Sequence, residues 1–230
     1  MRYQKDQVME VSRIRALRGP NLWSRHTAIE AIVACAEHER SIDKLPGFEQ
    51  RLRARFPAIG ELHPGGPSSP LTLAHILKKA ALVMQAQAGC PVTFSRLSAT
   101  MDPGVYQVVV EYSEEEVGRQ AFALAQSLVQ AAQDDTAFDI TAAIDQLRDT
   151  DESERLGPST GAIVEAAAAR NIPWRRLTQG SLVQFGWGSR QRRIQAAEID
   201  STSAVAESIA QDKDLTKKLL RAAGVPVPHG

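Results

Sequence analysis

The sequence predicts a mixed fold, with helices and strands in one core over residues 1–156 and the start of an α/β unit over residues 157–230. Two observations carry the first part of this prediction. The stretch "VYQVVVEY", residues 105–112, is the strongest strand signal in the chain. Apolar residues recur at helical spacing over residues 71–88 and 115–132, which predicts two largely buried helices.

The length and composition favour a globular protein. A chain of 230 residues with 43% hydrophobic content can bury a sizeable core. It has no apolar run long enough to span a membrane, and its first residues lack the apolar stretch of a secretory signal. We therefore expect a cytoplasmic protein without a membrane contact. Cys35 and Cys90 lie in apolar contexts, which indicates buried, reduced thiols.

The charge of the chain is balanced in total but uneven along its length. Residues 1–60 hold eleven Lys and Arg against seven Asp and Glu, residues 61–156 hold six against fourteen, and residues 157–230 hold ten against six. The net charge of zero argues against a nucleic-acid binder or an anionic-membrane binder. The uneven distribution suits either ordinary solvated faces or a partner that carries charges of both signs.

The N-terminal elements follow from the spacing of apolar residues. Residues 8–18 alternate apolar and polar side chains, which predicts a half-buried strand ended by Gly19 and Pro20. The segment "HTAIEAIVACAEHER" then places four apolar side chains at helical intervals, and this spacing predicts a helix over residues 27–38. The four are Ile29, Ile32, Val33 and Ala36.

A short basic helix is predicted next, after a turn at Pro46 and Gly47. This helix carries Arg51, Arg53 and Arg55. The segment "GELHPGGPSSP" that follows is rich in Gly, Pro and Ser, and it predicts a loop.

The two long helices of the first part have recognisable ends. Gly89 is expected to close the helix over residues 71–88. After the strand, Ser113 is the expected N-cap, with Glu116 three residues later to complete a capping box. The acidic first turn also suits the helix dipole. Residues 134–155 are acidic and polar, with weak helical spacing.

The second part begins at the tripeptide "LGP", where the acidic, polar composition of residues 134–155 ends. The segment "GPSTGAIVEAAAARNIPWRRL" reads as a helix followed by extended chain, and "SLVQFGWGSRQRRIQAA" as a short strand pair. The segment "DKDLTKKLLRAAGVPVP" reads as a capped helix ended by Gly224. This alternation is typical of the start of an α/β unit.

Two features of the second part are suited to anions. Ser159 and Thr160 are expected at a helix N-terminus, where free N–H groups favour a carboxylate or phosphate, although plain capping would use the same residues. Arg190 and Arg193 follow two glycines, in a stretch that fits either an anion site or a hairpin with a solvated basic strand.

Seven blocks of residues, in order along the chain, resemble the N-terminal portion of cyanophycin synthetases. The resemblance runs from about Leu17 to Gly230, and seven ordered blocks are more specific than any single motif. The blocks are "LRGPNLWS", "LPGF", "LAHILKKAALVMQAQAGCPV", "PGVYQVVVEYSEEEVGRQA", "LGPSTGAIVEAAAARNIPW", "LVQFGWGSRQRRIQAA" and "DKDLTKKLLRAAGVPVP".

The resemblance implies a fold and a substrate. It implies an α+β N-terminal domain over residues 1–156, which in the family holds the growing polymer, and the incomplete start of an α/β ATP-grasp domain over residues 157–230. With a further Mur-ligase-like domain, these domains build a polymer with an aspartate backbone and arginine side chains. ATP and Mg²⁺ serve the full-length family member. Their binding residues would lie after Gly230, so no cofactor and no ligation are expected for this chain alone.

Some family members carry the zinc signature H-x-x-E-H in the helix that corresponds to residues 71–88, where it serves a hydrolytic site. Such a site needs two imidazoles one helical turn apart and a glutamate that activates the metal-bound water. This chain keeps His75 but has Lys78 and Lys79 in place of the glutamate and the second histidine. We therefore expect no metal, and interpret His75 as a core residue or a polar cap.

The sequence hypothesis is a non-catalytic chain that binds the Asp–Arg polymer. The candidates for its carboxylates are Arg51, Arg53 and Arg55, the candidates for its guanidinium groups are Glu114, Glu115 and Glu116, and the further candidates for substrate binding are Ser159, Thr160, Arg190 and Arg193. One alternative is a stand-alone regulatory or assembly protein that associates with itself or with a full-length synthetase. The other is a zinc-dependent polymer hydrolase.

Overall fold

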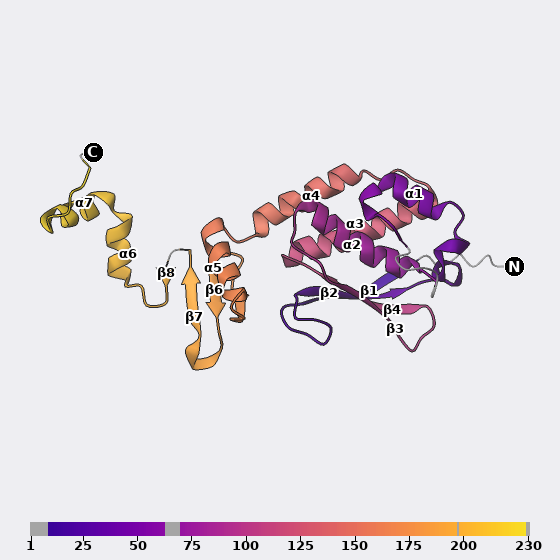
Figure 1. Ribbon diagram of the computed structural model, residues 1–230, viewed down its shortest axis with the longest axis horizontal. Coiled ribbons are helices and arrows are strands. Elements are labelled where there is room, and N and C mark those ends of the chain that lie inside the picture. The colour runs from indigo at the N-terminus through magenta and orange to yellow at the C-terminus, as the bar shows by residue number, and fades with distance from the viewer. Residues whose placement is uncertain (1–8, 63–69, 197, 229–230) are drawn as a thin grey trace. The chain divides into compact units, whose positions relative to one another are not determined.

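The computed structural model describes residues 9–62, 70–196 and 198–228 (Figure 1). The chain divides between Arg155 and Leu156 into two compact units, called here the first and the second unit. Both sheets are antiparallel, and the mixed α+β class that the sequence predicts for the first part is confirmed. The start of an α/β unit predicted for residues 157–230 differs from the structure, because all the strand pairs described there are antiparallel. The expected "GELHPGGPSSP" loop lies largely outside the described residues.

The first unit is a four-stranded antiparallel sheet in the order β1-β2-β4-β3, with helices on one face (Figure 1). The strands are β1 (Glu10–Leu17), β2 (Ala28–Ala34), β3 (Ser95–Ala99) and β4 (Val105–Glu111). The helices are α1 (Phe48–Arg55), α2 (Leu73–Ala88), α3 (Glu115–Asp134) and α4 (Ile140–Glu154), with 3-10 turns at Glu37–Arg40, Ile42–Lys44 and Pro57–Ile59. In the described part of this unit no helix lies on the other face, which we call the open face.

The predicted helix over residues 27–38 is wrong, because this segment forms strand β2 and a following 3-10 turn. β2 pairs with β1 on one side and with β4 on the other. Ile29, Ala31 and Val33 point into the core, so the apolar residues fit a period of two as well as a helical period. The β-branched side chains and two satisfied strand edges favour the strand.

The other predicted elements of the first unit are present. Strand β1 ends before Gly19, strand β4 matches the strongest strand signal, and Gly89 closes α2 in the left-handed conformation with φ 101°. The weak helical spacing after α3 corresponds to a full helix, α4, whose N-cap Asp139 accepts a 3.0 Å hydrogen bond from the backbone N–H of Ala142. Strand β3 carries no strong pattern, and the sequence did not predict it.

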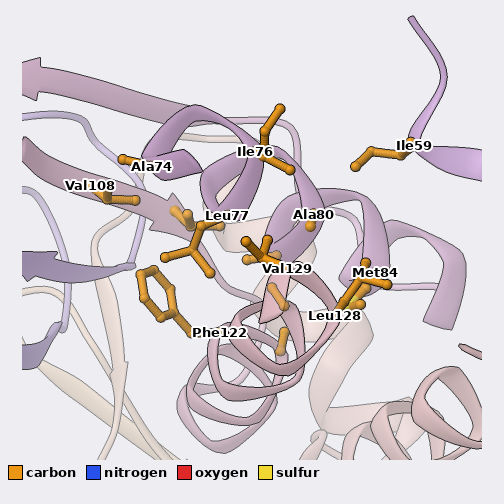
Figure 2. Packing of buried hydrophobic residues seen from close by; sticks show 14 of the residues in the cluster. Ile59, Ala74, Ile76, Leu77, Ala80, Met84, Val108, Phe122, Leu128 and Val129 are labelled. Atoms are coloured by element: carbon orange, nitrogen blue, oxygen red, sulfur yellow. The ribbon is translucent and has the colours of Figure 1, made fainter. Parts of the chain in front are cut away.

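The core of the first unit lies between the sheet and helices α2 and α3. Figure 2 shows Leu77 and Ala80 from α2 gathered with Phe122 and Val129 from α3 in one cluster. All four are at most 1% exposed. The α1 and α4 helices pack on α3 from outside, and both cysteines are buried free thiols, as the sequence predicts.

Two buried carboxylates join segments of the first unit. Glu39 is fully buried and accepts hydrogen bonds from the backbone N–H of Met9 at 3.0 Å and from Nε2 of Gln133 at 2.9 Å. Glu111, 8% exposed, accepts from two consecutive backbone N–H groups just before β3, those of Thr93 and Phe94, both at 2.7 Å. Backbone and side-chain donors of the first unit therefore satisfy each buried carboxylate in place of water.

The second unit is a small antiparallel sheet in the order β5-β6-β7-β8 with flanking helices. Its core consists of Val164, Val183 and Ile194, with Leu156 and Phe185 packed against them. The elements are α5 (Pro158–Ala168), β5 (Trp174–Arg176), β6 (Leu182–Phe185), the 3-10 turn Gly188–Arg190, β7 (Arg192–Gln195), β8 (Glu198–Ile199), α6 (Ala204–Gln211) and α7 (Lys213–Ala222). No helix among the described residues is long and apolar enough to cross a membrane.

Candidate functional site

Arg51 and Arg55 of α1 both reach the C-terminal end of α3. Arg51 donates from Nε to the carbonyl oxygen of Ala132 at 2.7 Å. Arg55 donates from Nε to the carbonyl oxygen of Thr136 at 2.7 Å and from Nη2 to Asp135 at 2.9 Å. The last carbonyls of a helix lack intrahelical donors and form the negative end of its dipole. The two guanidinium groups therefore hold α1 against α3.

Arg53 is the most exposed of the three arginines of α1. Its side chain is 44% exposed, against 25% for Arg51 and 15% for Arg55. It forms an ion pair of 2.8 Å with Glu49 one turn earlier in α1, and such an exposed pair is easily exchanged for another partner. Of the predicted carboxylate ligands in α1, Arg53 is thus the one whose charge a polymer could reach.

The acidic cluster at the start of α3 is partly neutralised inside the first unit. Glu115 accepts from Nε of Arg18 at 2.6 Å and from Nε of Arg119 at 3.0 Å. The hydrogen bond from Arg18 is the main reason why the pKa of Glu115 lies below its ordinary value. Glu114 is half-buried, while Glu116 is exposed. Glu116 is therefore the most accessible of the three acids.

The capping box expected at Ser113 is wrong. Helix α3 begins at Glu115 with Glu114 as its N-cap, one residue later than predicted. The Ser113 hydroxyl instead lies 3.4 Å from the carboxylate of Asp151 in α4. The serine thus serves the packing of α4 on the first unit rather than the cap of α3.

The basic and acidic candidates lie at opposite ends of the same helix. Arg51 and Arg55 contact the C-terminal end of α3, whereas Glu114, Glu115 and Glu116 form its start. A helix of 20 residues is about 30 Å long, at 1.5 Å per residue. The structure does not bring the two predicted clusters together, so only an extended ligand could meet both.

His75 is a polar cap at the start of α2. Its Nδ1 accepts a hydrogen bond from the backbone N–H of Thr72 at 3.2 Å, which makes His75 part of a capping box. A neutral imidazole that accepts at Nδ1 carries its proton on Nε2. Burial, and then the neighbouring charge of Lys78, lower the pKa of His75. The interpretation of His75 as a polar cap is confirmed.

The two lysines that follow His75 give this part of α2 a positive character. Burial, followed by the charge of Lys79, lowers the pKa of Lys78. Lys79 donates from Nζ to the backbone carbonyl of Glu61. Within the parts of the chain that the structure describes, no three His, Cys, Asp or Glu side chains form a group that could hold a metal ion.

Ser159 and Thr160 occupy the first turn of α5, as the sequence predicts. Gly157 is the N-cap residue, and Pro158 stands at the first helical position. Thr160 is only 3% exposed, whereas Ser159 is exposed. Of these two candidates, only Ser159 presents its hydroxyl where a ligand could approach.

Arg190 and Arg193 are both exposed, and they lie on either side of the start of β7. Arg193 stands opposite the buried Gln184 of the neighbouring strand β6. On the other side of β6, Gln184 stands opposite Arg175, whose guanidinium group lies 5.6 Å from the centre of the Trp187 ring. Arg193 and Arg175 thus lie on either side of Gln184 across this sheet. A role of Arg190 and Arg193 in binding stays a prediction.

The open face of the first sheet carries a group that the sequence reasoning missed. Arg15, Glu30, Val109 and Arg96 stand opposite one another in successive strands, and so form one row across β1, β2, β4 and β3. Trp23, from the β1–β2 loop, donates from Nε1 to Glu30 at 3.3 Å, and Arg96 lies 5.5 Å from the centre of its ring. We call these five residues the open-face row.

Glu30 is the buried centre of the open-face row. It is 3% exposed and accepts hydrogen bonds from Arg15, Gln107 and Trp23. The hydrogen bond from Arg15 is the main reason why the pKa of Glu30 is lowered. The negative charge of the row is therefore enclosed, while Arg15 stays 68% exposed and Arg96 is exposed as well.

Comparison with known proteins places the chain beside one family. Residues 30–134 match the family model described as "Cyanophycin synthase-like N-terminal domain". Over 238 residues the chain is 37% identical to the cyanophycin synthetase of Trichormus variabilis, and over 237 residues it is 35% identical to that of Geminocystis herdmanii. These alignments cover 96% of this chain but only 26% and 27% of the two relatives. The chain thus spans about a quarter of the length of the curated relatives it matches.

Proposed function

We propose, from the premise that this chain is homologous to the N-terminal portion of cyanophycin synthetases, that its first unit binds and tethers an Asp–Arg polymer for ATP-dependent elongation. The homology is the observation that carries the proposal, because it extends over 96% of the chain. The exposed charges of both signs on the first unit support it. A polymer that alternates carboxylate and guanidinium groups can pair with both.

The proposed binding is distributed over many weak contacts. Arg53 and Glu116 are exposed but lie on different elements, and α3 separates the basic and acidic clusters by its whole length. An exposed ion pair contributes about 0.2 to 1 kcal/mol, so useful affinity requires several pairs at once. A long polymer is therefore expected to bind, and a single Asp–Arg dipeptide is not.

For the second unit we propose the beginning of an ATP-grasp ligase domain. The homology supports this assignment, since the match to the synthetases continues through both units. Ser159, at the start of α5, and the exposed Arg190 and Arg193 are its candidates for anionic groups of the substrate. The proposal gives ATP and Mg²⁺ to the activity of the whole protein and assigns no residue of this chain to them.

The binding proposal is tested by titrating the full chain with Asp–Arg polymers of increasing length at low and at high salt. We expect affinity to rise steeply with polymer length and to fall with added salt, because exposed charge pairs are screened. The dipeptide is the matched control, since it presents the same groups once. Equal affinity for dipeptide and long polymer, or no effect of salt, would show that a single deep pocket binds the ligand.

A second candidate function is assembly with another copy of this chain or with a full-length synthetase. The apolar side chains that α6 and α7 leave exposed favour this assembly role, because exposed apolar patches often mark protein–protein contacts. They include Val205, Leu215, Leu219 and Leu220, between 38% and 69% exposed. Light scattering of the purified chain, and of Leu215→Ser and Leu219→Ser variants, tests it. A monomer that these substitutions leave unchanged rules out self-association through this face.

A further inference from the structure

We propose that the open-face row of the first sheet is a binding surface for the carboxylates of an extended polyanionic chain. Arg15 and Arg96 would take the carboxylates, with the guanidinium group of Arg96 held over the Trp23 ring. The inference deepens the polymer binding proposed above and rests on it for the identity of the natural ligand. It assigns the carboxylate contacts to the sheet rather than to Arg51 and Arg55 of α1, which hold helix α3.

The strand register carries the geometric part of the argument. Arg15 stands opposite Glu30, Glu30 opposite Val109, and Val109 opposite Arg96. Residues that face each other in an antiparallel sheet point to the same side, and Ile29 and Val110, their neighbours in β2 and β4, point into the core. The side chains of the row therefore all lie on the open face.

The charges that the row exposes are positive, because Arg15 and Arg96 are exposed and Glu30 is buried. The exposed Glu10, at the start of β1, faces the same side of the sheet but lies outside the row. Glu30 is enclosed by Arg15, Trp23 and Gln107. An approaching ligand consequently meets the guanidinium groups before it meets the carboxylate beneath them, which attracts an anion and repels a cation.

The chemistry of the exposed groups favours carboxylates. An arginine presents five N–H donors in a planar fork that matches a carboxylate, and Arg15 uses its Nε for Glu30. Arg96 lies over the Trp23 ring, so that face of the indole is already occupied and is a poor platform for stacking a nucleic-acid base. The row is thus better suited to a polycarboxylate than to a single-stranded nucleic acid.

The width of the sheet indicates the length of a ligand that would cross the row. Arg15 and Arg96 are three strand spacings apart, and at about 4.8 Å per spacing their backbones are about 14 Å apart. Two fully extended residues span about 7 Å, and four span about 14 Å. A chain of about four extended residues therefore matches the separation of the two backbones, and the arginine side chains, which reach toward Glu30 and Trp23, shorten the distance that the ligand itself must cover.

The test uses Trp23 as its own reporter. In the full chain with Trp174→Phe and Trp187→Phe, Trp23 is the remaining tryptophan, and synthetic polyaspartate is the probe. We expect saturable fluorescence changes that Arg96→Gln weakens by about three- to tenfold in affinity and Arg96→Lys weakens less. Arg148→Gln, on α4, removes the same charge from the helical side and should leave affinity unchanged.

The outcomes separate this inference from the proposed function. Polyaspartate affinity that is equal in the parent and Arg96→Gln chains, or reduced as much by Arg148→Gln, would overturn the assignment of the row. Tighter binding of single-stranded DNA than of polyaspartate would overturn the choice of ligand. Binding of polyaspartate that depends on Arg96, without any binding of the Asp–Arg polymer, would support the row and refute the function. Since Arg96 is exposed, its substitution should not unfold the sheet.

Discussion

Arg51 and Ala132, 81 positions apart in the chain, are joined by a hydrogen bond of 2.7 Å from the guanidinium group to the last turn of α3. Arg51, a candidate ligand group in the sequence, therefore serves the packing of α1 on α3. This contact also has an energetic consequence. A hydrogen bond from a charged donor to a buried carbonyl stabilises the folded state by about 1.5 to 3 kcal/mol.

We therefore predict that Arg51→Gln and Arg55→Gln each lower the free energy of unfolding of the first unit by about 1 to 3 kcal/mol. Arg53→Gln, in the same helix, removes an exposed pair and should change it by less than about 1 kcal/mol. Urea denaturation followed by circular dichroism measures all three. Equal losses at the three positions would show that Arg51 and Arg55 do not hold α3.

The second prediction concerns Gly118, where α3 packs closely on the sheet. A Cβ atom there would lie 2.5 Å from Cβ of Tyr112 and 3.1 Å from Cγ1 of Ile29. Gly118→Ala should destabilise the first unit by about 1 to 3 kcal/mol, despite the better helix propensity of alanine. In α5, Gly161→Ala meets nothing closer than 3.7 Å and should stabilise the second unit. Thermal unfolding of both variants measures these two changes in stability. A Gly118→Ala protein as stable as the parent would contradict the close packing.

The third prediction is that His75 titrates below about 6.5, the ordinary pKa of histidine. A histidine whose pKa is lowered by folding stabilises the folded state only while it is neutral. This contribution is complete above the unfolded pKa and declines as the pH falls toward the folded one. Lys78→Gln removes a neighbouring charge and should raise the pKa of His75. NMR titration of the imidazole measures both values, and an unchanged pKa in the variant would contradict the role of Lys78.

The fourth prediction follows from the ion pair between Arg15 and Glu30. The lowered pKa of Glu30 means that its ionised form is stabilised by folding. This stability is present above the unfolded pKa of a glutamate, about 4.3, and is lost as the pH falls through the folded value. Glu30→Gln should therefore reduce the stability difference between neutral and acidic pH. Denaturation curves at the two pH values measure it, and an identical difference in both proteins would refute the prediction.

Most of the fold follows from sequence patterns, and the exceptions have physical causes. The α2 and α3 helices have clear apolar stripes, and β4 is rich in β-branched residues, so the patterns match the structure. The sequence pattern of β2 predicts a helix because β2 is a central strand, paired on both sides. Buried central strands lose the polar alternation that marks a half-exposed strand.

Less of the candidate site than of the fold could be predicted from the sequence. Arg51 and Arg55 looked like surface charges because the sequence does not show that α1 ends beside the last turn of α3. Arg15 and Arg96 stand 81 positions apart, and only the strand order places them in one row. The available signal was Glu30, a lone acid in an otherwise apolar segment, which needs a partner when buried.

The burial of Glu30 has a consequence for the chain during its synthesis. Strand β2, "AIEAIVA", emerges from the ribosome long before β4, so one of its edges must wait unpaired while α1, α2 and β3 are made. An apolar strand with a free edge readily joins another copy of itself. A charged residue in its middle opposes that association, and its enclosure by Arg15, Trp23 and Gln107 is complete only when β4 has joined the sheet. Glu30→Ile is accordingly expected to raise the aggregated fraction of freshly made protein, which sedimentation of cell extracts can measure.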